Sequence, residues 1–243
     1  MKSKVVDLLI IALLLWSVLS IPSYTETVRH VWKMAEQPIV VFDPGHGGID
    51  GGAVAEDGTT EKDINLNIAL ELKRLLEDEG VRVIMTRMSD GGLYEENDKA
   101  AIRTLKTQDM YERKRIIDEA DADLTVSIHL NSFTEDGGVK GAQVFYPSEG
   151  DESIIESSKN AAEIVQTDLN RKINTDKQRT EMGKNDVFLL KETSGPIIIV
   201  ECGFLSNRED LEMLKNAKEQ EEISKTLKGS ICKYLSIIGN KTQ

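Results

Sequence analysis

From residue 38 onward, the chain alternates between short apolar runs and longer stretches with helical periodicity. The apolar runs predict strands at residues 38–43, 81–87, 124–130, 141–147, 186–190 and 196–205. Apolar residues that recur every three or four positions predict helices at residues 59–80, 109–120, 152–172, 207–214 and 219–235. Strands that are apolar along their whole length are typical of a sheet covered on both faces. The pattern predicts a single α/β domain, with a mostly parallel twisted sheet of about six strands and helices on both faces.

The beginning of the chain has a different pattern. Lys2 and Lys4 precede an apolar run at residues 8–21, and Pro22 follows it. Basic residues before an apolar run are typical of an export signal, and this run is short of the roughly 20 residues of a membrane-spanning helix. A buried core helix is the alternative interpretation. We predict three parts: an export signal or membrane anchor at residues 1–22, a polar linker at 23–37 and a folded catalytic domain at 38–238.

Composition and charge narrow the classes of partner. The 243 residues are 40% hydrophobic, which is enough for a substantial core. Lysine and arginine total 30 against 42 acidic residues, a formal net charge of −12. An acidic surface repels phosphate backbones, so we expect no nucleic-acid partner, and we expect membrane contact only through the N-terminal segment. The two cysteines, Cys202 and Cys232, are predicted to be free, buried thiols.

Four residues able to carry chemistry stand near strand ends or at a helix start. His46 and His129 follow or end predicted strands, Glu61 opens the first helix, and Glu201 lies in the last strand. In parallel α/β folds, functional groups gather beyond the carboxyl ends of the strands. Two imidazoles and one carboxylate are a common catalytic zinc set, and zinc activates water and polarises carbonyls. Burying the charge of Glu201 in an apolar strand costs free energy unless the residue has a partner or a function. A carboxylate at this position is suited to proton transfer.

Each of these residues has a simpler interpretation. His46 could fill a glycine-rich turn, and His129 could be a core histidine with satisfied hydrogen bonds. Glu61 could favour the helix dipole, and Glu201 could belong to a buried ion pair. The combination nevertheless favours zinc, and His30, in the predicted linker, is interpreted as a solvated bystander. A dinucleotide-binding loop is excluded because Asp50 stands where the last glycine of G-x-G-x-x-G belongs, and the chain has no G-x-S-x-G motif.

Four motifs carry a family resemblance. They are DPGHGG at residues 43–48, TEKDINL at 60–66, SIHLNS at 127–132 and VECGFLSN at 200–207. In this order, they resemble the zinc-dependent N-acetylmuramoyl-L-alanine amidases of the type 3 family. The resemblance implies one Zn²⁺ on His46, Glu61 and His129, with Glu201 as the catalytic carboxylate. It also implies a peptidoglycan substrate, cut at the amide between N-acetylmuramic acid and L-alanine.

Within that family, the chain looks most like small sporulation amidases, which join an export segment to a lone catalytic domain. The stretches GAQVFYP and VFLLK add to this match. The resemblance implies action on spore cortex, before muramic-δ-lactam forms, and a later role in germination. Some relatives carry an inserted blocking helix, for which residues 133–140 are too short. Control is then expected from expression timing or from an activating or stabilising protein partner. A catalytically inactive binding module and a zinc peptidase that cuts stem peptides remain the alternatives.

Overall fold

The computed structural model describes residue 11 and residues 37–95 and 101–241. The predicted export segment and linker fall almost entirely outside these residues, so they stay predictions. Residues from Pro38 onward form one compact unit. Within the described part of the chain, no helix is both long and apolar enough to cross a membrane.

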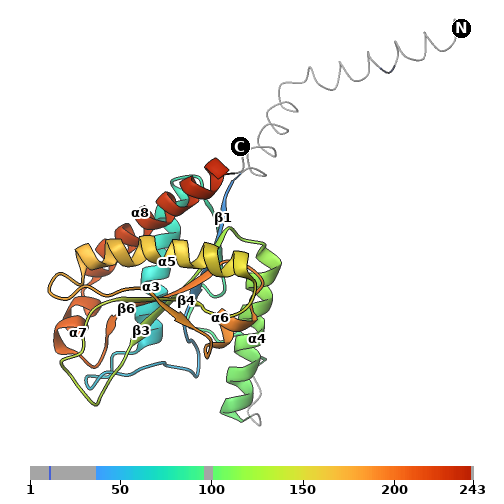
Figure 1. The fold of residues 1–243 in the computed structure, drawn as a ribbon. Coiled ribbons are helices and arrows are strands. Elements are labelled where there is room, and N and C mark those ends of the chain that lie inside the picture. Colours follow the sequence, from blue (N-terminus) through green and yellow to red (C-terminus); the bar gives the residue numbers. More distant parts are fainter. Residues whose placement is uncertain (1–10, 12–36, 96–100, 242–243) are drawn as a thin grey trace, which may run out of the picture. The chain divides into compact units, whose positions relative to one another are not determined.

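The core of the unit is a six-stranded sheet in the order β2-β1-β3-β6-β4-β5 (Figure 1). The strands are β1 (Ile39–Pro44), β2 (Arg82–Met85), β3 (Leu124–Asn131), β4 (Gln143–Pro147), β5 (Met182–Lys184) and β6 (Ile197–Phe204). The first four strands of this order are parallel, whereas β4 runs antiparallel to β6 and parallel to β5. The prediction of a mostly parallel sheet of six strands is confirmed.

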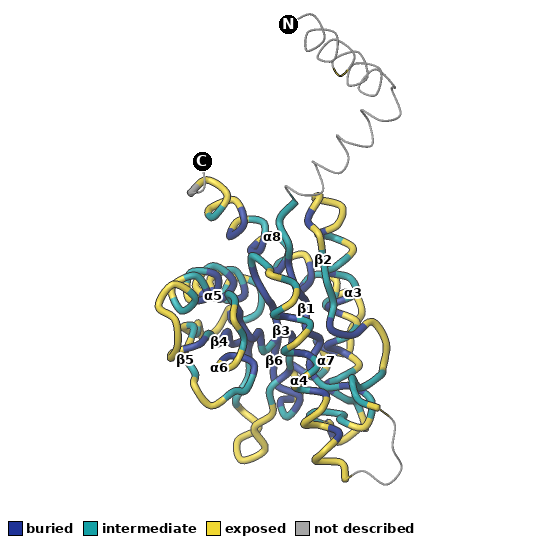
Figure 2. Tube along the Cα trace, turned by 90° about the vertical axis from the view of Figure 1, so that its right-hand side faces the viewer, coloured by how far each residue is buried: buried dark blue, intermediate teal, exposed yellow. Residues whose placement is uncertain are grey.

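Helices cover both faces of this sheet. They are α3 (Glu61–Glu77), α4 (Ile102–Ala120), α5 (Glu152–Lys172), α6 (Phe188–Glu192), α7 (Arg208–Lys215) and α8 (Ala217–Lys241). Alternate strand residues point to opposite faces. Thus Phe42 and Ile198 pack with α3, α5 and α8 in a large apolar cluster, whereas Val41 and Ile199 pack with α4 and α6 in a smaller one. Figure 2 shows the buried strands between these layers.

Two local predictions need correction. Residues 186–190 were predicted to form the fifth strand, but the short helix α6 occupies Phe188–Glu192, and the fifth strand is β5. A run of five mostly apolar residues does not distinguish a strand from a helical turn, and here Leu189 and Leu190 are buried as adjacent helical residues. The β5 strand, with the sequence MGK, is too short and too polar to give a periodic signal.

The helix predicted at residues 109–120 begins earlier, at Ile102. The sequence analysis missed its first turns because the buried face of the helix is partly polar. The buried positions of α4 are Leu105, Asp109, Arg113 and Ile117, which follow one another at four-residue spacing. Two charged residues in this stripe conceal its helical pattern from an analysis of apolar residues. The connection between β3 and β4 contains no helix, as its length predicted.

Candidate metal and catalytic site

The glycine-rich loop after β1 turns sharply and aims a histidine at the sheet edge. His46 has a φ angle of 64°, in the left-handed region that residues other than glycine rarely adopt. Gly48 follows at 57°, and the backbone groups of Gly47 and Asp50 exchange two hydrogen bonds of 2.9 and 3.0 Å. Strain of this kind persists where the surroundings enforce it, often at functional sites. The loop therefore holds His46 in a conformation that the residue would not adopt by itself.

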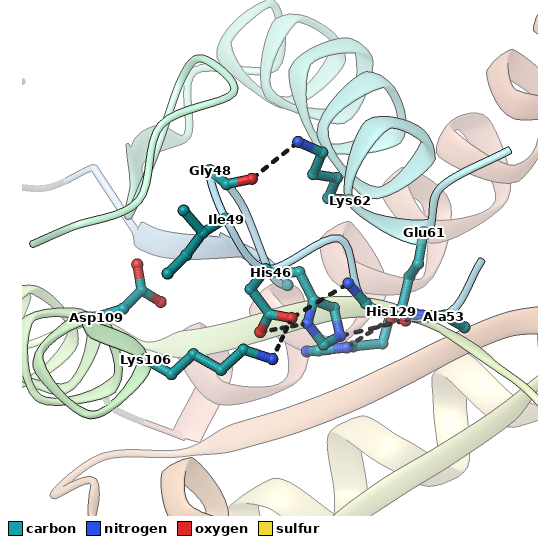
Figure 3. A network of polar contacts seen from close by, with 12 residues as sticks. His46, Gly48, Ile49, Ala53, Glu61, Lys62, Lys106, Asp109 and His129 are labelled. Atoms are coloured by element: carbon teal, nitrogen blue, oxygen red, sulfur yellow. Dashed lines mark hydrogen bonds and ion pairs between the residues drawn. The ribbon is translucent and has the colours of Figure 1, made fainter. Parts of the chain in front are cut away.

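Three of the sequence-predicted residues meet at this edge (Figure 3). Nε2 of His46 lies 3.2 Å from one carboxylate oxygen of Glu61, and Nδ1 of His129 lies 2.9 Å from the other. The two imidazole rings are 5.0 Å apart and nearly perpendicular. One nitrogen or oxygen from each residue lies within 4.8 Å of the others. Residues separated by up to 83 positions in sequence therefore form one cluster.

The cluster explains why glycines surround the histidine. A Cβ atom on Gly45 would stand 2.2 Å from Cε1 of His129, so any side chain there would displace that ring. A Cβ atom on Gly52 would stand 2.5 Å from a carboxylate oxygen of Glu61. Gly52 also has a φ angle of 68°, which favours glycine by itself. The glycines keep the space in which the imidazoles and the carboxylate approach one another.

Glu61 is the centre of the cluster. It is the first residue of α3 and is only 3% exposed. Its Oε1 accepts hydrogen bonds from the backbone N–H of Leu130, at 3.0 Å, and from the side chain of Asn65, at 3.3 Å, while Oε2 accepts one from Ala53 at 2.9 Å. Burial would raise the pKa of Glu61, but hydrogen bonds with the two histidines outweigh it and hold the pKa far below its usual range. Glu61 is therefore a fixed, ionised carboxylate.

The donor set fits a zinc ion. With bonds of about 2.0–2.1 Å, neighbouring ligand atoms of a tetrahedral zinc site lie roughly 3.3 Å apart, close to the separations of Glu61 from each histidine. Burial lowers the pKa of His46, but the carboxylates of Glu61 and Asp50 outweigh it and raise that pKa to about 9. The metal-free cluster therefore attracts positive charge, as protons or as a cation. Two imidazoles and one carboxylate leave a fourth position for water, as catalytic zinc requires.

Glu201 stands on β6 directly beside His129 on β3. The two residues are Cα partners in the parallel ladder, so their side chains leave the same face of the sheet. Oε2 of Glu201 is buried and has no hydrogen-bond partner among the described residues. Burial raises the pKa of its carboxyl, to which the charge of Glu61 adds. An unpartnered buried carboxyl beside the cluster is suited to exchanging a proton with a bound molecule.

Cys202 points the other way, into the apolar cluster with α3, α5 and α8, and is fully buried. Both cysteines are free thiols, as predicted, although Cys232 is only partly buried. Burial raises the pKa of the Cys202 thiol, so this sulfur is a poor candidate for a metal ligand. The site therefore lies on one side of β6 and the thiol on the other.

A buried charge network beneath the loop was missed by the sequence analysis. Arg113 of α4 donates hydrogen bonds to Asp43, at 2.6 Å, to Asp109, at 2.5 Å, and to the carbonyl oxygens of Pro44 and His46. Burial would raise the pKa of Asp43, but Arg113 and a hydrogen bond from Ser127 lower it to about 2. The network fixes the backbone on both sides of Gly45, at the start of the loop. The available signal was Asp43 itself, a charge at the end of an apolar strand.

A cavity of about 200 Å³ opens beside the two histidines. Its floor includes Asp43, Arg113 and Ser127, and its walls are mostly apolar. The apolar lining residues are Ile49, Met110, Val187, Leu189 and Ile199. The histidine cluster thus adjoins a recess that is lined by both apolar and charged residues.

Comparisons with known proteins agree with this geometry. Residues 40–233 match the family model described as N-acetylmuramoyl-L-alanine amidase. The chain is 33% identical to the germination-specific N-acetylmuramoyl-L-alanine amidase of Bacillus subtilis, over 86% of each chain. Among solved structures, it is similar to the CwlD amidase of Clostridioides difficile, determined in complex with the GerS lipoprotein, with 39% identity and a TM-score of 0.77 over 83% of this chain and 100% of that one.

A second solved structure is the amidase AmiC2 of Nostoc punctiforme, with 31% identity and a TM-score of 0.68. That likeness covers 82% of this chain and 97% of the other. The relatives thus span nearly the same length as the folded unit described above. The chain therefore belongs to the N-acetylmuramoyl-L-alanine amidase family and is a peptidoglycan amidase.

Proposed function

We propose that the amidase is zinc-dependent, that His46, Glu61 and His129 hold one zinc ion, and that Glu201 is the catalytic carboxylate. The observation that carries this proposal is the convergence of the three donor groups within 4.8 Å at the carboxyl edge of the sheet. When bound, zinc supplies a Lewis acid and activates water. The other tasks belong to the protein's own residues.

His46, Glu61 and His129 would hold the zinc ion, and Glu201 stands beside His129 in the sheet, where it can act on an amide bound at the cluster. The bond to be cut joins the lactyl group of N-acetylmuramic acid to L-alanine. Glu201, with its raised pKa, accepts the proton of the attacking water and passes it to the nitrogen of the departing L-alanine.

We further propose spore cortex peptidoglycan as the substrate, cut during sporulation so that muramic-δ-lactam can form and germination can follow. Support comes from the germination-specific relative and from the similarity to the CwlD amidase. Residues 1–22 serve as an export signal or membrane anchor, and residues 23–37 as a linker to the catalytic domain at 38–238. A lipoprotein partner of the kind solved with the CwlD amidase would activate or stabilise the enzyme.

Metal analysis tests the ligand assignment. The purified full-length protein should contain about one zinc per chain, and His46→Ala or His129→Ala should remove it. The metal should also dissociate below about pH 6, because a protonated imidazole cannot bind zinc. Full zinc occupancy in either variant would contradict the assignment.

Glu201→Gln tests the division of roles. Glutamine keeps the shape of the side chain but cannot accept the proton, so the rate should fall by about 10²–10⁴ while the zinc content stays unchanged. Mass spectrometry of digested muropeptides identifies the bond that is cut. Free stem peptides that begin with L-alanine support the amidase. Cuts within the stem would support a zinc peptidase, and intact muropeptides an inactive binding module.

A further inference from the structure

The two histidines of the cluster differ in the contacts of the ring nitrogen that faces away from Glu61. Nδ1 of His46 lies 3.0 Å from Oδ2 of Asp50, four residues later in the same loop. His129 has no such support, because within the described part of the chain its hydrogen bond runs from Nδ1 to Glu61, on the cluster side. Of the two histidines, and among the described residues, only His46 therefore has a carboxylate on the ring nitrogen that faces away from Glu61.

Asp50 is itself held from several directions. Its Oδ1 accepts hydrogen bonds from Nζ of Lys106, at 2.8 Å, and from the backbone N–H of Gly52, at 3.3 Å. Its backbone closes the tight turn with Gly47. Lys106 comes from α4, so a second element of the fold fixes the carboxylate. The side chain of Asp50 is about one quarter exposed, and that of Lys106 about half exposed.

We propose that Asp50 is the positioning residue of the metal centre: it accepts a hydrogen bond from Nδ1–H of His46 and so leaves Nε2 unprotonated and directed at the metal, while Lys106 holds the Asp50 carboxylate in line. This inference rests on the proposed zinc site. A carboxylate behind a metal-binding imidazole fixes its tautomer and ring orientation and makes it a better ligand.

The two histidines also differ in their backbone conformation. His46 has a φ angle of 64° and stands in the loop that follows β1. His129 stands in a regular strand, where the ladder and the close approach of Gly45 define its ring position. The two imidazoles are similarly buried, with 24% and 23% of their side chains exposed, so the contact with Asp50 is what distinguishes His46 from His129.

The test compares zinc affinity in full-length variants, measured by competition with a chromophoric chelator. Asp50→Ala should weaken zinc binding by about 10–100-fold, the usual cost of losing such a partner. Asp50→Asn keeps an oxygen that can accept the Nδ1–H bond and should recover part of the loss. Lys106→Met should weaken binding by only a few-fold. With Co²⁺ in place of zinc, Asp50→Ala should alter the visible absorption bands, which report the ligand geometry.

Asp57→Ala is the matched control. Asp57 lies seven residues after Asp50 in the same connection to α3, and it too pairs with a lysine, Lys215, at 2.6 Å. Its loss removes the same charge without touching His46, so zinc affinity should stay at the wild-type value. Equal weakening by Asp57→Ala and Asp50→Ala would overturn the proposal in favour of a general charge effect.

Unchanged affinity in Asp50→Ala would overturn this inference alone; if the alanine variant does not fold, Asp50→Leu, which also lacks a hydrogen-bond acceptor, takes its place. Near-ultraviolet circular dichroism of the zinc-free proteins establishes which variants are folded. A wild-type protein that binds no zinc would overturn the proposed function and this inference together. The two failures are therefore distinguishable.

Discussion

The two faces of the sheet differ in the polarity of the residues buried on them. On the face covered by α3, α5 and α8, the strands contribute a continuous apolar layer. On the face covered by α4 and α6, the apolar cluster is small, and polar groups such as Asp43, Ser127 and Arg113 are buried beside it. His129 and Glu201 leave the sheet on this second face, next to the same polar groups.

Because of this difference, we expect substitutions on the two faces to have different effects on stability and activity. Apolar contacts stabilise the fold without directional demands, so the first face tolerates modest losses. Buried charges on the second face depend on exact partners, and one of these partners, Arg113, also holds the backbone at Pro44 and His46. Damage to the first face should therefore lower stability alone, whereas damage to the second should lower stability and activity together.

Arg113→Met should have the largest effect on stability. It leaves Asp43 and Asp109 as buried carboxylates without their partner, which typically costs about 3–5 kcal/mol. The loop around His46 also loses two backbone anchors, so activity should fall below what the folded fraction explains. Chemical denaturation and the rate per folded molecule measure both effects.

The control for this variant is Arg115→Met on the same helix. Arg115 pairs with Glu112 and Glu119 at the surface, so its loss should leave the unfolding midpoint and the activity almost unchanged. A comparable loss in both variants would show that α4, rather than the buried network, determines the effect.

Leu72→Ala on the apolar face should lower the free energy of unfolding by about 2–5 kcal/mol, because it leaves a cavity in the core. Leu72 is fully buried, and its position eleven residues after Glu61 places it about 16 Å along α3 from the site. The rate per folded molecule should therefore match wild type at a temperature where the variant is folded. A reduced rate there would break the separation between the faces.

Acidification should remove the contribution of Asp43. Its pKa is lowered from 3.8 to about 2, so its ionised form favours the folded state by on the order of 2 kcal/mol. Because the folded-state pKa is the lower one, this stability is fully present above about pH 4 and is lost as the pH falls toward 2. Denaturation curves between pH 5 and 2 should show the loss, and Asp43→Asn should flatten it. An unchanged slope in Asp43→Asn would assign the acid sensitivity to other groups.

Cys202→Ala should have the smallest effect. The thiol is buried in the apolar cluster and points away from Glu201, so its loss should cost about 1 kcal/mol of stability and leave zinc content and rate unchanged. Thermal unfolding and a muropeptide assay check both. A clear loss of activity would contradict the conclusion that the thiol lies on the side of β6 away from the site.

The apolar face and the strands beneath it could be predicted from the sequence. Runs such as residues 38–43 and 196–205 are apolar because both of their faces are covered. This pattern can be recognised without knowing which strands are neighbours in the sheet. The fifth strand could not be predicted, because β5 has only three residues and depends on β4 for its conformation. The helix α6 resembled a strand because its two buried leucines are adjacent.

The candidate site was predictable as far as single residues are unusual for their position. His46, His129 and Glu201 stand out because polar groups seldom occur in or just after apolar strands. Arg113 did not stand out, because in sequence it looks like Arg115 two positions later. Only the approach of β1 to α4 makes one of them a buried anchor and leaves the other at the surface.

The order of strands has a consequence for how the enzyme is made. β3 and β4 are consecutive in sequence, but they are kept apart in the sheet by β6, which begins at Ile197, well after the end of β4 at Pro147. A nascent chain that ends before Ile197 already contains His46, Glu61 and His129, but it exposes the edge of β3 and lacks Glu201. Closing the sheet and delivering the proposed catalytic carboxylate are therefore a single event.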